Sequence, residues 1–152
     1  ELTTGPEIIS AMNGIGKSVD AFVAGVGTGG TLSGIGRALK KENPNTKVYA
    51  LEPSESPLLK DGKTGKHGIA AGFIPKNLDK DVYDGIVEVS TDEAMKIACE
   101  VAKNEGFLPG IFAGANIHGA IELAKKLGKG HAAVTVSPDG GDRYLSTALF
   151  NE

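Results

Sequence analysis

The chain has 152 residues, of which 40% are hydrophobic and 23% are charged, and its formal net charge is −3. These values are typical of one soluble globular domain that spans residues 1–152. The slight negative charge provides no basic surface for nucleic acid, and no apolar run approaches the roughly 20 residues that cross a membrane. Because the sequence has one cysteine and no signal peptide opens it, we expect a cytoplasmic protein without an internal disulfide.

Short apolar segments alternate with stretches of helical spacing along the whole chain. Strands are predicted over residues 21–24, 48–51, 85–89 and 132–136. Helices are predicted over residues 3–14, 31–42, 91–105 and 117–127, with a terminal helix from Arg143. The alternation predicts an α/β fold: a three-layer αβα sandwich, Rossmann-like and doubly wound, around a parallel sheet of about four strands.

A glycine-rich segment joins the first predicted strand to the helix that follows it. We call residues 25–31, with the sequence G-V-G-T-G-G-T, the glycine loop. A strand, a loop and a helix start in this order aim backbone N–H groups and the positive end of a helix dipole at one point, where a phosphate fits. The candidate cofactor-binding residues are Gly27, Thr28, Gly29, Gly30 and Thr31, and the two threonines add hydroxyl donors. As a structural alternative, Thr31 suits a helix N-cap.

The glycine loop taken alone has more than one interpretation. Gly25, Gly27 and Gly30 satisfy the dinucleotide pattern G-x-G-x-x-G, and Glu52 lies at about the distance expected for the ribose acceptor. NAD-type nucleotide binding is therefore one hypothesis. A tightly packed turn without a ligand is another.

Four motifs occur in order: T-T-G-P-E-I from Thr3, G-V-G-T-G-G-T from Gly25, A-G-F-I-P from Ala71 and R-Y-L-S-T-A-L-F from Arg143. Together they resemble the C-terminal half of cysteine synthase (O-acetylserine sulfhydrylase), a fold-type II pyridoxal-phosphate enzyme. The resemblance covers nearly the whole chain. It implies that the glycine loop binds the 5′-phosphate of pyridoxal phosphate and that Glu52 merely closes a strand.

The same resemblance implies that part of the catalytic machinery lies elsewhere. In that family the lysine that forms the Schiff base with the cofactor, and the loop that binds the substrate carboxylate, belong to an N-terminal half that these 152 residues do not match. We therefore expect no catalytic residue and no cysteine synthase activity in this chain alone. We also expect either self-association or a separate N-terminal half as its partner.

Two stretches depart from the family pattern. The family usually reads G-I-S-S-G-A, with the first serine bonding the pyridine nitrogen, whereas this chain has Phe112 and Ala113 at the two serine positions. Phe112 has no group for that bond. We expect its ring to fill the pocket near the edge of the cofactor, and the alternative is that the local backbone has moved and another ligand binds. Earlier in the chain, His67 and Ala70 stand where the family has Gln and Gly, which puts a close contact with the ligand in doubt.

Several residues keep two interpretations. Asp139 lies in a turn that matches the family's P-D-[SG]-G near the cofactor ring, so it is either catalytic or an ordinary turn residue. We expect Cys99 to face the protein core from its helix and His118 to be exposed, and we expect no metal site. Since the glycine loop, Pro53 and the Asp139 turn each follow a strand, we expect them at one edge of the sheet.

Three functions remain open from the sequence. The first is the cofactor-phosphate domain of a cysteine synthase, isolated or engineered, that retains a site for pyridoxal phosphate or only for phosphate. The second is a purely structural α/β domain without a ligand. The third is a nucleotide-binding domain that uses the glycine loop and Glu52.

Overall fold

The computed structural model describes residues 1–62 and 73–149. In these residues, four strands form one parallel sheet in the order β3-β2-β1-β4, which confirms the predicted α/β fold. The strands are β1 (Ala21–Gly25), β2 (Lys47–Pro53), β3 (Gly85–Val89) and β4 (Ala133–Thr135). The helices are α1 (Thr4–Gly14), α2 (Gly30–Glu42), α3 (Leu58–Asp61), α4 (Thr91–Glu105) and α5 (Ile111–Leu127), followed by the 3₁₀ turn η1 (Gly141–Tyr144).

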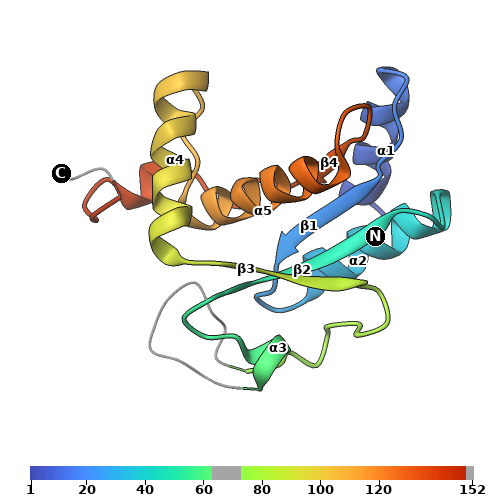
Figure 1. Ribbon diagram of the computed structural model, residues 1–152, viewed down its shortest axis with the longest axis horizontal. Coiled ribbons are helices and arrows are strands. Elements are labelled where there is room, and N and C mark those ends of the chain that lie inside the picture. The colour runs from blue at the N-terminus through green and yellow to red at the C-terminus, as the bar shows by residue number, and fades with distance from the viewer. Residues whose placement is uncertain (63–72, 150–152) are drawn as a thin grey trace.

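The central strand β1 divides the core between the two faces of the sheet. Its side chains alternate, so Phe22 and Ala24 pack with α2 on one face, while Ala21 and Val23 pack on the face of α5. Helix α1 packs beside α2, and α4 packs against α5. Figure 1 shows α5 lying along one side of the sheet, α2 along the other, and α4 standing across the end of α5. Helices thus cover both faces, as a parallel sheet requires.

Close approach of helices to the sheet depends on two glycines. A Cβ at Gly36 of α2 would lie 2.9 Å from Val82 and 3.2 Å from Val48, and a Cβ at Gly119 of α5 would lie 2.8 Å from Leu51. Gly34 of α2 makes no such approach to the sheet, because the atoms nearest a Cβ there belong to Glu1.

The structure corrects three of the predicted elements. Helix α5 begins at Ile111, six residues earlier than predicted, so that Phe112 and Ala113 belong to its first turn. The short helix α3 lies in a connection that was predicted to have no regular structure. The terminal element is the 3₁₀ turn η1 instead of a helix from Arg143. His67 and Ala70 lie outside the described residues.

None of the helices in the described residues combines the length and the apolar character needed to cross a membrane.

Candidate functional site

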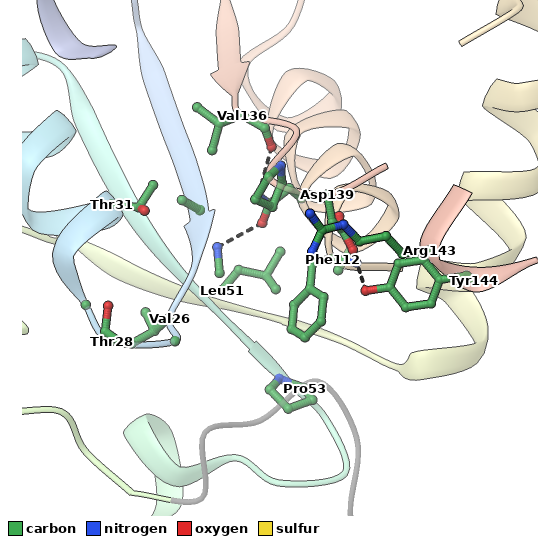
Figure 2. Close-up of a pocket in the computed structure, with 17 residues that line it drawn as sticks. Val26, Thr28, Thr31, Leu51, Pro53, Phe112, Val136, Asp139, Arg143 and Tyr144 are labelled. Atoms are coloured by element: carbon green, nitrogen blue, oxygen red, sulfur yellow. Dashed lines mark hydrogen bonds between the residues drawn. The ribbon is translucent and has the colours of Figure 1, made fainter. Parts of the chain in front are cut away.

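The carboxyl ends of three strands open into one pocket of about 340 Å³. The glycine loop lines it after β1, Pro53 lines it at the end of β2, and Pro138 and Asp139 line it after β4. The prediction that these segments meet at one edge of the sheet is therefore correct. Figure 2 shows Thr28 and Thr31 on one side of the pocket, and Phe112, Arg143 and Tyr144 on the other.

The glycine loop supplies the side of the pocket that suits an anion. Of the five predicted residues, Gly27, Thr28, Gly29 and Thr31 line the pocket, and Gly30 is the first residue of α2. Among the described residues no side chain caps α2, so the first N–H groups of the helix are left for water or a ligand. Thr31 lies inside the first turn, and the N-cap position predicted for it belongs to Gly29.

Gly29 has a conformation and an environment that only glycine fits. Its φ is +84°, in the left-handed region. A Cβ at this residue would lie 2.8 Å from both the backbone nitrogen and the Cα of Leu78. The backbone can therefore turn sharply from β1 into α2 while lying directly against another segment.

Asn116 fixes the start of the glycine loop from the opposite layer of the fold. Its side chain is 3% exposed. The carboxamide oxygen accepts a hydrogen bond from the Gly25 N–H (2.8 Å), and the amide nitrogen donates to the Val136 carbonyl oxygen (2.9 Å). One side chain of α5 thus joins the ends of β1 and β4. No sequence motif points to Asn116. The one feature that marks it in the sequence is its polar side chain on the apolar side of a helix.

The far side of the pocket is built around Asp139. Its carboxylate accepts hydrogen bonds from the backbone N–H groups of Phe112 (3.1 Å) and Ala113 (2.7 Å) and from the Tyr144 hydroxyl (2.7 Å). Burial, followed by the hydrogen bond to the Asp139 carboxylate, raises the pKa of Tyr144 to about 12. The phenol is therefore protonated at neutral pH and donates to Asp139.

Phe112 lines the pocket and is 43% exposed, while Ala113 is fully buried. The expectation that the Phe112 ring fills the pocket is wrong, because about 340 Å³ stays open beside it. Arg143, which is exposed, also lines this side, and it forms no ion pair within the described residues. The far side thus combines aromatic surface with one cationic side chain.

Glu52 does not take the position that a ribose acceptor needs. Its side chain is 4% exposed, and its carboxylate accepts from the backbone N–H groups of Leu59 (2.6 Å) and Lys60 (3.0 Å). These bonds hold the carboxylate at the start of α3, and Glu52 does not line the pocket, although its neighbours Leu51 and Pro53 do. The geometry agrees with the structural interpretation of Glu52 and gives no support to the nucleotide hypothesis.

Cys99 and His118, the other residues considered in the sequence, do not line the pocket. Cys99 is half-buried, and its thiol donates to the Leu149 carbonyl oxygen (2.9 Å). His118 is half-buried and not exposed as predicted. The search for three or more metal-ligating side chains found none in the described part of the chain.

Comparison with known proteins shows the family. Residues 2–139 match the family described as pyridoxal-phosphate dependent enzyme. The chain belongs to this family. Cysteine synthase of Staphylococcus aureus (strain Mu50 / ATCC 700699) is 54% identical over 99% of this chain and 49% of its own length. A probable cysteine synthase of Bacillus subtilis (strain 168) is 45% identical over 98% of this chain and 49% of its own length. The chain thus spans about half the length of the curated relatives it matches.

Solved structures agree with this assignment. A hydrogen sulfide-producing enzyme from Fusobacterium nucleatum is 45% identical, with a TM-score of 0.91 over 97% of this chain and 45% of its own. O-acetyl serine sulfhydrylase isoform 3 from Entamoeba histolytica is 40% identical, with a TM-score of 0.90 over 97% of this chain and 44% of its own. The resemblance to cysteine synthase predicted from the four motifs is confirmed, for a domain that covers about half of these proteins.

Proposed function

We propose that the glycine loop binds the 5′-phosphate of pyridoxal phosphate, and that residues 1–152 by themselves bind this group or inorganic phosphate without synthesising cysteine. The observation that carries the proposal is the N-terminus of α2. It has no side-chain cap in the described residues and opens into the pocket of a chain that belongs to a pyridoxal-phosphate dependent family. The helix dipole and the N–H groups at such an end favour a phosphate.

The residues of the loop fit a phosphate group. Gly27 and Thr28 are exposed, and a Cβ at Gly27 would meet no described heavy atom within 4 Å, so an anion has room to approach the backbone there. The hydroxyls of Thr28 and Thr31 have no hydrogen-bond partner among the described residues. Two hydroxyl donors and the N–H groups of one helix end are a suitable donor set for phosphate oxygens.

The remaining walls of the pocket would surround the ring of the cofactor. Leu51 and Val136 lie between the loop and the far side, which Phe112 and Tyr144 line. When bound, pyridoxal phosphate supplies an electron sink for reactions at an amino acid. In that complex, the glycine loop of this chain would hold the phosphate, and the apolar walls of the pocket would cover the ring.

Turnover by residues 1–152 alone is not expected. None of the described residues that line the pocket is a lysine, so no amine there is placed to hold the cofactor covalently. Lys60 and Lys76 lie outside the pocket wall, and Lys63 and Lys66 lie outside the described residues. In the family the covalent lysine belongs to the N-terminal half, which we propose as the partner of this chain.

Exposed apolar side chains support a covering partner. Phe107, Leu108 and Leu145 are 48%, 43% and 59% exposed, and they lie in the segments just before α5 and just after η1, the two elements that carry Phe112 and Tyr144. The cytosol is the proposed compartment, in keeping with the single cysteine. Light scattering tests the alternative of self-association, since a monomer at every concentration tried argues against it.

Calorimetric titration with inorganic phosphate, pyridoxal phosphate and NAD tests the binding proposal. Binding of phosphate or pyridoxal phosphate supports it, and binding of NAD alone supports the nucleotide hypothesis instead. If none of the three compounds binds, the result supports a purely structural domain. A parallel assay with O-acetylserine and sulfide, with pyridoxal phosphate added, is expected to give the rate of the protein-free mixture. A faster rate contradicts the proposed inactivity.

A further inference from the structure

Asp139 makes more side-chain hydrogen bonds than the position of a turn residue requires. Its Oδ2 accepts from the Phe112 N–H and from the Tyr144 hydroxyl, and its Oδ1 accepts from the Ala113 N–H. The donors come from two separate segments, the first turn of α5 and the 3₁₀ turn η1. One carboxylate therefore holds together two segments that lie on the same side of the pocket.

Backbone contacts hold this carboxylate in place. The Gly110 N–H donates to the Asp139 carbonyl oxygen (2.9 Å), and the Gly141 N–H donates to the Leu108 carbonyl oxygen (2.9 Å). Gly110 also leaves the space in which the carboxylate sits, because a Cβ there would overlap it and lie 2.7 Å from Tyr144 Cε2. Loss of the carboxylate would thus remove the side-chain bonds and leave the backbone connection intact.

Both aromatic residues bound to Asp139 line the pocket. Phe112 is bonded through its backbone, so the carboxylate fixes the place from which the ring extends, whereas Tyr144 is bonded through its own hydroxyl. Figure 2 shows the two rings on the side of the pocket away from Thr28 and Thr31. We call Phe112 and Tyr144 the aromatic wall. It lies where the ring of a phosphorylated ligand would be when its phosphate is in the glycine loop.

We propose that Asp139 is a positioning residue that sets the affinity of the pocket for the ring of a phosphorylated aromatic ligand, while contributing nothing to the affinity for the phosphate itself. The inference deepens the proposed function and rests on it. Asp139 acts through the aromatic wall, since its carboxylate is engaged by two backbone N–H groups and one phenol. A residue with only a structural role would affect both parts of a ligand equally.

Two probes separate these roles by calorimetry: inorganic phosphate, which reaches only the loop, and pyridoxine 5′-phosphate, which adds the ring. Pyridoxine phosphate carries an alcohol in place of the aldehyde, so it cannot react with surface lysines. Asp139→Ala is expected to raise the Kd of pyridoxine phosphate about tenfold and to leave the Kd of phosphate within about twofold. Asp139→Asn is expected to restore the affinity only in part, because one amide oxygen replaces the two carboxylate oxygens that accept from Phe112 and Ala113.

Tyr144→Phe keeps the backbone bonds of Asp139 and removes only the phenol bond. We expect it to raise the Kd of pyridoxine phosphate about threefold. Tyr144→Phe therefore provides a second variant if Asp139→Ala fails to fold. A spectroscopic titration supplies an independent readout. In Asp139→Ala, and to a smaller extent in Asp139→Asn, the Tyr144 phenol is expected to titrate at a lower pH than in the wild type.

The outcomes distinguish the two proposals. Wild-type protein that binds neither probe overturns the proposed function and the positioning role together. Wild-type protein that binds phosphate with no gain from the ring leaves the loop as an anion site and overturns the role of Asp139 alone. Equal weakening of both probes by Asp139→Ala, or an unchanged Tyr144 titration, also overturns that role.

Discussion

Two helices, α2 and α5, begin at the same pocket, and their N-termini are treated in opposite ways. The first turn of α5 receives a carboxylate from elsewhere in the chain, Asp139, which bonds two of its N–H groups. The N-terminus of α2 begins at Gly29 with no side-chain cap among the described residues. Both ends attract negative charge. This chain closes the end of α5 with its own carboxylate, and the end of α2 has no such cap among the described residues, as the proposed phosphate site requires.

The difference is local and does not follow from the fold. Both helices follow a glycine as N-cap, Gly29 for α2 and Gly110 for α5, and neither glycine provides a side chain. The turn after β4 carries Asp139 over α5, whereas the residues nearest the start of α2 are the hydroxyl-bearing Thr28 and Thr31. Carboxylates would repel a phosphate, and hydroxyls can donate to it.

Gly29→Ala is expected to be the most damaging of these changes. The left-handed φ of +84° strains any other residue, and the new Cβ would lie 2.8 Å from the backbone of Leu78. Together we expect a loss of about 3 kcal/mol in the free energy of unfolding, measured by urea denaturation.

The matched control is Gly27→Ala in the same loop. A Cβ at Gly27 would meet no described heavy atom within 4 Å, so the free energy of unfolding should change by less than about 0.5 kcal/mol. The Kd of phosphate should nevertheless rise, because Gly27 lines the pocket. A destabilised Gly27→Ala protein, or one with unchanged phosphate affinity, contradicts the assignment of the loop as the open anion site.

Asn116→Ala tests the connection between the two helix ends. The change leaves the Gly25 N–H and the Val136 carbonyl oxygen without their partner in a buried site. We expect a loss of about 2–3 kcal/mol in the free energy of unfolding and weaker phosphate binding, because the loop loses its fixed start. Asn104→Ala, an exposed residue in the last turn of α4, controls for helix propensity and should have little effect.

Helix caps also explain which elements could be predicted from the sequence. Helix α4 begins with a local capping box, Ser90 and Glu93, and both of its bonds are present in the structure. The predicted elements did not include α3, and the predicted start of α5 was too late. Both helices are capped by residues distant in sequence from their N-termini: Glu52 caps α3 and Asp139 caps α5. Spacing rules read only neighbouring residues, so a cap that arrives from another strand end leaves no local signal.

In the pocket, too, local features could be predicted from the sequence and long-range contacts could not. The short apolar runs predicted the four strands within two residues of their observed ends, because a strand buried on both faces must be apolar. The glycine pattern placed the loop at the correct edge of the sheet. The sequence did not reveal that Asn116 holds the loop or that Asp139 bonds the first turn of α5, because the residues in these contacts lie at least 20 positions apart. Tyr144 is only five positions from Asp139, but no local pattern marks their bond.

Asp139→Ala measures how much the closed helix end contributes to stability. Three hydrogen bonds to one carboxylate are lost, all at a partly exposed site, and we expect a decrease of about 2 kcal/mol in the free energy of unfolding. Asp142→Ala, in the same turn, is the control. Asp142 is exposed, and its side chain makes no hydrogen bond within the described residues, so a change above about 0.5 kcal/mol there would show that the turn itself is fragile.

The smallest expected effect is a pH dependence that belongs to the closed end only. The pKa of Tyr144 is raised from 10.0 to about 12 in the folded protein, so the unfolded chain releases this proton first as the pH rises. Because burial and then the bond to Asp139 both favour the neutral phenol, its contribution to stability is complete below pH 10 and is lost progressively between about pH 10 and pH 12. In Tyr144→Phe the contribution is missing throughout. Its free energy of unfolding should be lower than that of the wild type at pH 9 by less than about 1 kcal/mol. Above pH 10 this difference should shrink and then reverse, because only the wild type has a phenol that ionises in a site that disfavours its charge. Lysines titrate in both proteins, so the difference between them isolates Tyr144. A constant difference over this range would show that the phenol is not held by the carboxylate that closes α5.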